Sequence, residues 1–487
     1  MLDKHAVINL NNQLKNLKKY FSHRNWLANE YFYITRPSVE VLKKYDLKPN
    51  VFSQIKNKYL LVILFPAYLV FSIILNLIYA LLVPGKKVKI HNKNYPVFFV
   101  SHATIDNPSH ANGDRIYGDL LKTRNSSSKN LVYFLNHTKG NNKTLSQRIK
   151  RSIDADFVLN SKNLPIWKML YILIQNVALT LKIFVKHFST ILISKNGKHI
   201  IKILYFQISR KTTANLVIRE NIFDILQQTK CNNLVLTLEG HAYESVILEL
   251  VSSLKSNLKV FMFQHSPISH GQMALRDLIE GLNPNQHFLC SSPLVAKYLK
   301  LSFPEGKNSI YVIGSPKYEQ RQKVNNIKKK IVLAPEGLNS SLKEFLYLAK
   351  ILILQNHKKI VLRIHPALKV DIQNRYILRK LSKKDVFEIS QSSLKIDLAD
   401  AKYCIFRASS VGLESLAYQT IPVFYGNKWE NENVNPLKII DTDYIFLDSE
   451  NLKLLKSLKP KKDVTKNWIS YYSKLDISKF FDLTNQK

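Results

Sequence analysis

Apolar residues form one long uncharged run near the start of the chain, from Tyr59 to Val83. This length is sufficient for a helix that crosses the hydrocarbon core of a bilayer. The run begins too far along the chain for a cleavable signal peptide, and lysines on both sides leave its orientation undecided. We therefore expect an N-terminal region over 1–58 and a membrane segment over 59–84. Pro66 favours a monotopic or re-entrant helix as one alternative, and a buried soluble helix is another.

A second apolar run, from Leu164 to Phe188, has a different character. Lys168, Lys182 and Lys186 interrupt it, and Trp167 lies near its start. This pattern is typical of an amphipathic helix that lies in the interface of a bilayer. It equally fits a core helix with a narrow solvated edge, so the sequence leaves both interpretations open.

Beyond residue 90, short apolar runs alternate with helical spacing, which predicts parallel sheets connected by crossover helices. The first set of predicted strands covers 95–101, 131–138, 233–240, 258–266 and 309–316. After a lysine-rich linker, the second set covers 330–336, 359–366, 386–389, 401–409 and 421–426. Helices are predicted at 212–229, 243–254, 293–301, 341–355 and 410–420.

Because the alternation restarts after the linker, the sequence predicts an α/β protein with two Rossmann-like domains. We expect these domains over 90–321 and 328–445, with a C-terminal tail over 446–487. Ligands of such sheets bind beyond the carboxyl ends of the strands. Two facing domains would place the site in a cleft between them.

Charge suggests a class of partner. The 487 residues contain 72 Lys and Arg against 35 Asp and Glu, a formal net charge of +37. With 46% hydrophobic residues, the chain is too apolar for a disordered protein. Lysine, asparagine and isoleucine are abundant, so an AT-rich genome is one explanation of the excess. An anionic partner is the other, and membrane phospholipid or nucleotide-sugar ranks ahead of nucleic acid, for which no binding motif occurs. Three scattered cysteines favour neither a zinc site nor a disulfide framework.

Polar side chains gather at two predicted strand ends of the second domain. They are, in chain order, Arg363, His365, Pro366, Ser409, Ser410 and Glu414. Ser409 and Ser410 open a predicted helix, whose free N–H groups and dipole favour a phosphate. His365 and Arg363 are in a position to reach the same phosphate. The alternatives are N-capping for the serines and a hydrogen-bonded turn for His365.

In the first domain, Glu239 and Gly240 follow a buried-type strand, at a position where a carboxylate has little structural reason to occur. A carboxylate there can act as a general base. Glu244, on the next helical turn, has the simpler interpretation of complementing the helix dipole. His265 ends the following predicted strand, and it either lines the same site or is a capped loop histidine.

These motifs, in this order, resemble those of bacterial GT-B glycosyltransferases of surface polysaccharide synthesis. The greatest similarity is to polysialyltransferases and Kdo transferases, which use CMP-activated sugars, and to surface carbohydrate biosynthesis proteins. The resemblance covers about Asn233 to Gly426. It implies that Glu239 is the catalytic base, although Leu238 replaces the acid that precedes it in the family. It also implies that His365-Pro366 and Ser409-Ser410 bind the CMP part of the donor, with no essential metal and no further cofactor.

The sequence thus predicts an inverting glycosyltransferase on the cytoplasmic face of a bacterial inner membrane. Its donor would be a nucleotide-sugar that carries a nonulosonic acid or Kdo. Its acceptor would be a surface glycan or a lipid-linked precursor. A CDP-polyol phosphotransferase of teichoic-acid type, with His265 as the base, is an alternative, and a non-catalytic membrane scaffold is another. The chain has no P-loop or nucleophile-elbow motif. Asp154-Ala155-Asp156 matches a metal-binding DxD but follows no convincing strand.

Overall fold

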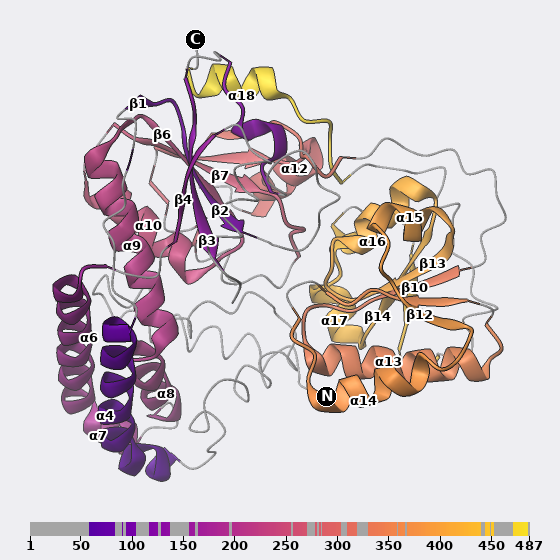
Figure 1. Ribbon diagram of the computed structural model, residues 1–487, viewed down its shortest axis with the longest axis horizontal. Helices are drawn as coiled ribbons and strands as arrows, with labels where there is room; N and C mark the ends of the chain where they lie inside the picture. The colour runs from indigo at the N-terminus through magenta and orange to yellow at the C-terminus, as the bar shows by residue number, and fades with distance from the viewer. Residues whose placement is uncertain are drawn as a thin grey trace.

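The computed structural model describes residues 58–82, 90, 94–103, 116–124, 128–136, 155–160, 164–193, 197–254, 257–269, 278–279, 282–283, 285–302, 309–318, 330–357, 359–365, 368–439, 444–448, 450–451 and 471–485. The predicted N-terminal region before Lys58 lies outside these residues, as do Asp154 and Pro366. Within them the chain forms two large parallel sheets, as the alternating pattern predicts, and a group of helices beside the first sheet (Figure 1).

The first sheet has seven parallel strands in the order β4-β3-β2-β6-β7-β8-β9. Their bounds are β2 Phe98–Ala103, β3 Leu131–Asn136, β4 Asp156–Leu159, β6 Asn233–Thr237, β7 Lys259–Gln264, β8 Gln286–Cys290 and β9 Ile310–Val312. The two-residue strands β1 (Asn94–Tyr95) and β5 (Lys230–Cys231) pair separately. The sequence did not predict β4 or β8, which are short and carry polar residues at their starts.

The second sheet has six parallel strands in the order β12-β11-β10-β13-β14-β15. Their bounds are β10 Lys330–Ala334, β11 Ile360–Leu362, β12 Phe387–Ile389, β13 Ala401–Phe406, β14 Ile421–Tyr425 and β15 Ile445–Leu447. In both sheets the first strand lies in the middle and the order reverses beside it. This is the doubly wound Rossmann arrangement, whose ligands bind at the point of reversal. Those points lie between β2 and β6 and between β10 and β13.

Helices connect the strands. In the first domain they are α9 (Arg210–Gln228), α10 (Ala242–Ser253), α12 (Pro293–Ser302) and the short η3 (Gly118–Leu121). In the second they are α13 (Asn339–Leu354), α14 (Ile372–Leu381), α15 (Leu394–Ala399), α16 (Val411–Glu414), η4 (Ser415–Tyr418), α17 (Lys428–Asn433) and η5 (Pro436–Lys438). The single helix predicted at 410–420 is therefore two short pieces, α16 and η4.

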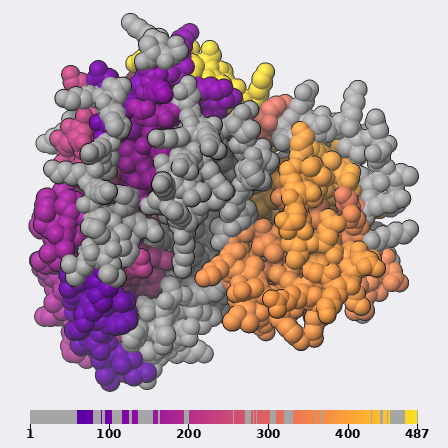
Figure 2. All heavy atoms as spheres, viewed as in Figure 1, coloured from indigo at the N-terminus to yellow at the C-terminus, as the bar shows by residue number. Residues whose placement is uncertain are grey.

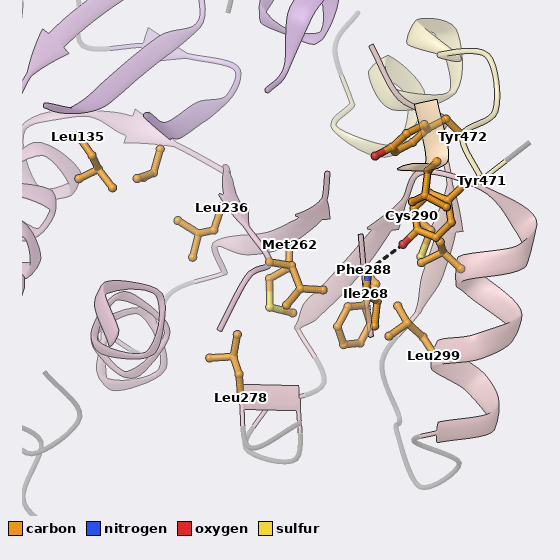
Figure 3. Packing of buried hydrophobic residues seen from close by; sticks show 14 of the residues in the cluster. Leu135, Leu236, Met262, Ile268, Leu278, Phe288, Cys290, Leu299, Tyr471 and Tyr472 are labelled. Atoms are coloured by element: carbon orange, nitrogen blue, oxygen red, sulfur yellow. Dashed lines mark hydrogen bonds between the residues drawn. The ribbon is translucent and has the colours of Figure 1, made fainter. Parts of the chain in front are cut away.

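Residues from the end of the chain complete the core of the first domain. Tyr471 lies among residues of β7, β8 and α12, and its hydroxyl accepts the backbone N–H of Ile268 at 2.9 Å (Figure 3). Helix α18 (Ile477–Leu483) places Phe480 against Phe99 of β2. Asn233 of β6 donates to the carbonyl of Thr484 at 2.9 Å. The described residues of the predicted tail, 471–485, thus pack on the first domain although they follow the second in the chain.

Four helices form what we call the helical arm: α4 (Lys58–Leu82), α6 (Ile166–Lys186), α7 (Phe188–Ile193) and α8 (Gly197–Gln207). They share one cluster of buried side chains, in which Phe65 stacks on Phe184 and packs edge-on against Tyr205. By length and composition, α4 over Tyr59–Ile78 and α6 over Ile166–Lys186 are candidate membrane helices. In the structure α4 packs along α6 and α8 and is not isolated (Figure 1).

Candidate functional site

Glu239 lies two residues beyond β6, at the point where the first sheet reverses its order. The backbone N–H of Leu238 still bonds to the carbonyl of Phe263 on β7, so the strand pairing continues up to the loop. Gly240 then has a φ of +80°, a conformation that side chains rarely adopt. This turn directs the chain into α10 and leaves the Glu239 side chain at the carboxyl edge of the sheet.

Glu244 holds this loop in place. Its carboxylate is fully buried and accepts the backbone N–H groups of Gly240 at 2.7 Å and His241 at 3.0 Å. It also accepts the hydroxyl of Thr237 at 2.6 Å. Burial raises the pKa of Glu244, partly offset by the positive field of His241 and the Thr237 bond. Glu244 is therefore a capping-box residue that shapes the loop, a fuller structural role than complementing the helix dipole.

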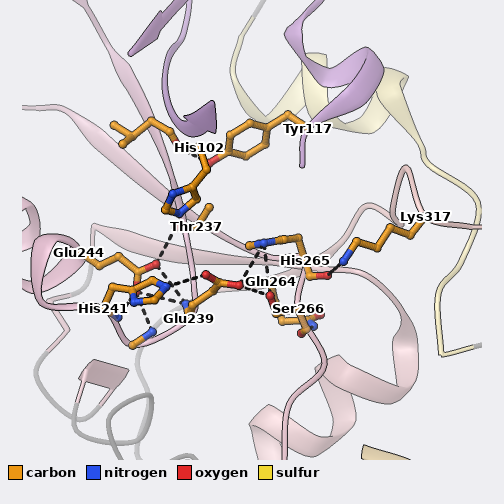
Figure 4. Close-up of polar contacts among 12 residues, drawn as sticks. His102, Tyr117, Thr237, Glu239, His241, Glu244, Gln264, His265, Ser266 and Lys317 are labelled. Atoms are coloured by element: carbon orange, nitrogen blue, oxygen red, sulfur yellow. Dashed lines mark hydrogen bonds and ion pairs between the residues drawn. The ribbon is translucent and has the colours of Figure 1, made fainter. Parts of the chain in front are cut away.

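The Glu239 carboxylate lies between two imidazole rings (Figure 4). His241 Nε2 is 2.8 Å from Oε2, and His265 Nε2 is 3.2 Å from Oε1. The Ser266 hydroxyl also donates to Oε1. Burial alone would raise the pKa of Glu239, but the charges and hydrogen bonds of His265 and His241 outweigh it and hold the pKa well below its usual range. With 22% of its side chain exposed, this ionised carboxylate remains accessible to a substrate.

His265 follows β7 and is almost completely buried. Its Nδ1 is enclosed and has no hydrogen-bond partner among the residues that the structure describes. A proton on Nδ1 would lack an acceptor there, so a single ring proton is best placed on Nε2, which faces Glu239. The backbone carbonyl of His265 accepts Lys317 Nζ at 3.2 Å. The arrangement makes His265 a donor that orients Glu239.

His102 and Tyr243 belong to the same cluster, and the sequence analysis missed them. His102 is at the end of β2, across the reversal point from Glu239, and its Nε2 lies 2.9 Å from the Tyr243 hydroxyl. That hydroxyl is 2.6 Å from Thr237 Oγ1. The predicted strand at 95–101 ended one residue too early to include His102. A histidine at the end of the central strand was the available signal.

One set of side chains in the described part of the chain could hold a metal ion. His102, Glu239 and His241 each offer a ligand atom, and these atoms lie within 4.8 Å of one another. Imidazole and carboxylate donors suit zinc. In this structure these side chains contact their neighbours instead: His241 contacts Glu239 directly, and His102 contacts Tyr243.

The second reversal point brings together the loops after β10 and β13, beside the loop after β11. Gly337 packs on the His365 ring so closely that an added Cβ would lie 2.9 Å from Nδ1. Ala408 has a φ of 46°, an unusual turn for a residue with a side chain. Ser409 Oγ accepts the backbone N–H of Val411 at 3.3 Å, whereas Ser410, the N-cap residue of α16, makes no side-chain capping bond. Ser409 and Ser410 are half-buried, and α16 after them has only four residues, so helix-dipole support for a phosphate is small.

The two arginines at this edge are occupied by carboxylates. Arg363 forms an ion pair with the buried Asp397 and donates to Ser390 Oγ at 2.9 Å. Arg407 is buried, contacts Glu344 Oε2 at 2.6 Å and donates to the carbonyl of Tyr425 at 2.9 Å. Arg407 is the basic residue that precedes Ala408 and Ser409, and these contacts hold its guanidinium in the core.

The structure thus gathers the predicted residues into two sets. Glu239 and His265 meet directly at the edge of the first sheet. His365, Ser409, Ser410 and Glu414 lie at the edge of the second, where Arg363 turns to Asp397. Both Glu414 and Arg363 act electrostatically on the pKa of Cys404, which burial raises. The two residues are therefore near neighbours of β13.

No protein-family model and no curated protein matches the chain. Its fold is similar to the Methanocaldococcus jannaschii UDP-GlcNAc 2-epimerase solved with UDP-GlcNAc and UDP, at 12% identity over 80% of this chain and 99% of that chain, with a TM-score of 0.50. A putative UDP-N-acetylglucosamine 2-epimerase from Listeria monocytogenes matches at 8% identity over 80% and 96%, with a TM-score of 0.49. The glycosyltransferase SnogD from Streptomyces nogalater matches at 11% identity over 81% and 100%, with a TM-score of 0.45. The chain therefore has an α/β, GT-B-like fold, as the sequence predicts.

Proposed function

We propose that this protein is an inverting glycosyltransferase that uses a nucleotide-sugar donor and Glu239 as its catalytic base. One observation carries the proposal: an ionised, accessible carboxylate lies at the reversal point of the first sheet, where ligands of such sheets bind. Proteins of similar fold include one solved with UDP-GlcNAc and UDP, which supports a nucleotide-sugar as the ligand.

The chemistry follows from the two edges. Glu239 takes the proton of an acceptor hydroxyl, whose oxygen attacks the anomeric carbon of the donor sugar. The bond from that carbon to the nucleotide phosphate breaks, and the phosphate leaves with the electron pair. Ser409, Ser410 and His365 donate hydrogen bonds to the departing phosphate. Because Arg363 and Arg407 are paired with carboxylates, these neutral groups and the backbone supply most of the recognition.

We further propose a CMP-activated nonulosonic acid or Kdo as the donor and a surface glycan or its lipid-linked precursor as the acceptor. The support is the resemblance of the Glu239-Gly240, His365-Pro366 and Ser409-Ser410 motifs to those of polysialyltransferases and Kdo transferases. The alternative base, His265 for a CDP-polyol phosphotransferase, is less favoured, since its Nε2 already contacts Glu239 and its Nδ1 is enclosed.

A donor panel tests this proposal. The purified chain is given CMP-, UDP-, GDP- and CDP-linked donors with a membrane extract as acceptor, and the released nucleotide and labelled product are measured. Release of CMP with a labelled glycan supports the proposal. An epimerised nucleotide-sugar formed without acceptor, or transfer of polyol phosphate from a CDP donor, would replace it.

Donor binding is tested separately by calorimetry. The double variant Ser409→Ala with Ser410→Ala should bind CMP about 100-fold or more weakly, because hydrogen bonds to a charged group contribute about 1.5–3 kcal/mol each. Ser340→Ala, in the first turn of α13, is the matched control. Equal affinity in the double variant and the wild type would show that these serines only cap α16.

A further inference from the structure

Most of the large hydrophobic side chains that are exposed in the described residues lie on the helical arm. On α4 they are Tyr59, Leu60, Ile63, Val70, Phe71, Ile74, Leu75 and Ile78. On α6 and α7 they are Ile166, Trp167, Leu170, Tyr171, Ile174, Leu181, Val185, Phe188 and Ile193. The surface of a soluble protein rarely exposes so many large hydrophobic side chains together, and such a patch marks an interaction site.

The exposed residues follow one face of each helix. On α4, Ile63, Val70, Ile74 and Ile78 recur at helical spacing, while Phe65 on the opposite face is buried. The corresponding stripe on α6 runs from Trp167 through Ile174 to Val185. The two helices pack together, and Figure 2 shows their indigo and magenta atoms at the surface of the same end of the molecule.

The charges of the arm have one sign. Helices α4, α6, α7 and α8 contain no Asp or Glu. Lys182 and Lys186 are exposed on α6, and each directly follows an exposed apolar residue, Leu181 and Val185 respectively. Lysines with long apolar stems keep their ammonium groups at an anionic surface while the stems lie along apolar neighbours. Trp167 at the other end of α6 is typical of a membrane–water interface.

We propose that the helical arm binds an anionic phospholipid bilayer, lying in its surface plane with the outer faces of α4 and α6 in the interface. The opposite faces are covered by protein along the same length, through α8 and α9. Buried polar contacts line that inner side, such as Asn76 to the carbonyl of Ile208 at 3.4 Å and Gln207 to Asn176 at 3.3 Å. Lipid therefore meets each helix from one side, as in a monotopic protein.

The arm also contacts the loop that carries Glu239. Ala242 is the residue after His241, and it belongs to the buried cluster of the arm. Binding through the outer faces would thus hold the Glu239 loop close to the membrane, where a lipid-linked acceptor is found. The membrane proposal itself does not depend on the transfer chemistry.

The small cavity at the junction of α6 and α9 is no phosphate site, because its basic groups are neutralised. Lys168 pairs with Asp224 at 2.6 Å, and Arg219 pairs with Glu220 at 2.6 Å.

Vesicle flotation of the full chain tests this surface. Phosphatidylcholine vesicles are compared with vesicles of phosphatidylcholine and phosphatidylglycerol. The variant Ile174→Glu with Val185→Glu replaces side chains that are 65% and 73% exposed, and it should lower the partition coefficient about tenfold or more, because charges are excluded from the apolar interface. Leu354→Glu with Ile372→Glu, both 81% exposed on the second domain, is the matched control and should bind like the wild type.

A second variant tests the charge term. Lys182→Glu with Lys186→Glu should abolish the preference for phosphatidylglycerol, and added salt should weaken the wild type in the same way. CMP affinity, measured on every variant, should stay unchanged, so failure here is separable from failure of the proposed function. Equal flotation of the arm and control variants would overturn the proposal. So would a wild-type dimer that the Ile174→Glu and Val185→Glu changes dissociate without any vesicle binding, since a second copy would then cover this face.

Discussion

Apart from the additional strand β9 of the first sheet, the two sheets have the same strand order, and yet their carboxyl edges hold opposite arrangements of charge. At the first edge a carboxylate, Glu239, is surrounded by the imidazoles of His241 and His265. At the second edge a guanidinium, Arg407, is surrounded by carboxylates, of which Glu344 is in direct contact. One fold thus builds two chemically different edges at its two reversal points.

The difference lies in whether the charged group is left available. Glu239 is partly exposed, and its partners are the imidazole rings of His241 and His265. Burial alone would lower the pKa of Arg407, but the carboxylates of Glu336, Glu430 and Glu344 together outweigh burial and raise this pKa above its usual range. The charge of Arg407 is therefore permanent and structural. The first edge therefore leaves its charged group accessible, and the second keeps its charged group paired within the core.

The largest effect is expected at the first edge. Glu239→Gln keeps the shape of the side chain but cannot accept a proton, so turnover should fall about 10²–10⁴-fold. Donor affinity should change little and the variant should still fold, although it loses the stability that the ionised carboxylate contributes above pH 4.5. The measurement is steady-state transfer with calorimetry on the same preparation. Turnover retained in Glu239→Gln but lost in His241→Ala would move the base to His241.

Removing the guanidinium at the second edge should affect stability instead. Arg407→Met leaves buried carboxylates without their cation, which costs about 3–5 kcal/mol of unfolding free energy in comparable sites. Urea unfolding measures this change. Lys402→Met, at an exposed position on β13, is the control and should stay near the wild type. A fully stable Arg407→Met variant would show that the network around Arg407 is not structural.

A subtler change separates positioning from chemistry at the second edge. Gly337→Ala places a Cβ against the His365 ring and displaces it. We expect CMP affinity to fall about tenfold, the magnitude of one lost hydrogen bond to a charged group, with little change in the unfolding free energy. Should CMP bind Gly337→Ala as tightly as the wild type, His365 does not contact the nucleotide.

The smallest effect concerns acid. Because the pKa of Glu239 is lower in the folded chain than its ordinary value of 4.5, its contribution to stability is complete above pH 4.5 and is lost as the pH falls below it. The stability difference between the wild type and Glu239→Gln should shrink over that range, as followed by urea unfolding at a series of pH values. A difference independent of pH below 4.5 contradicts the ion-paired geometry.

The sequence predicted the two parallel units because their central strands are uniformly apolar and their crossover helices are periodic. Buried strands such as β6 and β13 have side chains covered on both faces, and this burial makes the runs conspicuous. Edge strands such as β4 and β15 have only three or four residues and weaker patterns. Asp156, part of the rejected DxD pattern, begins β4 and accepts the Tyr95 hydroxyl at 3.1 Å.

The site was harder to predict because its contacts join distant residues. Glu239 and His265 follow neighbouring strands, so strand-end reasoning placed them together. The commitment of Arg363 to Asp397, thirty-odd positions away, depends on how α15 packs, and a linear pattern carries no trace of that. His102 was missed because the predicted strand stopped at 101, although β2 continues to Ala103.

The return of the C-terminal segment has a consequence for biosynthesis. Tyr471 fixes the loop after His265 by accepting the Ile268 N–H, and Phe480 fills the core beside Phe99. Chains are made from the N-terminus, and domains generally fold as they emerge. Here the core of the first domain includes residues that are translated after the entire second domain, so it is completed only after them. The loop that follows His265 is therefore completed last, so a nascent or prematurely terminated chain carries the edge of the second sheet before the edge of the first sheet is complete.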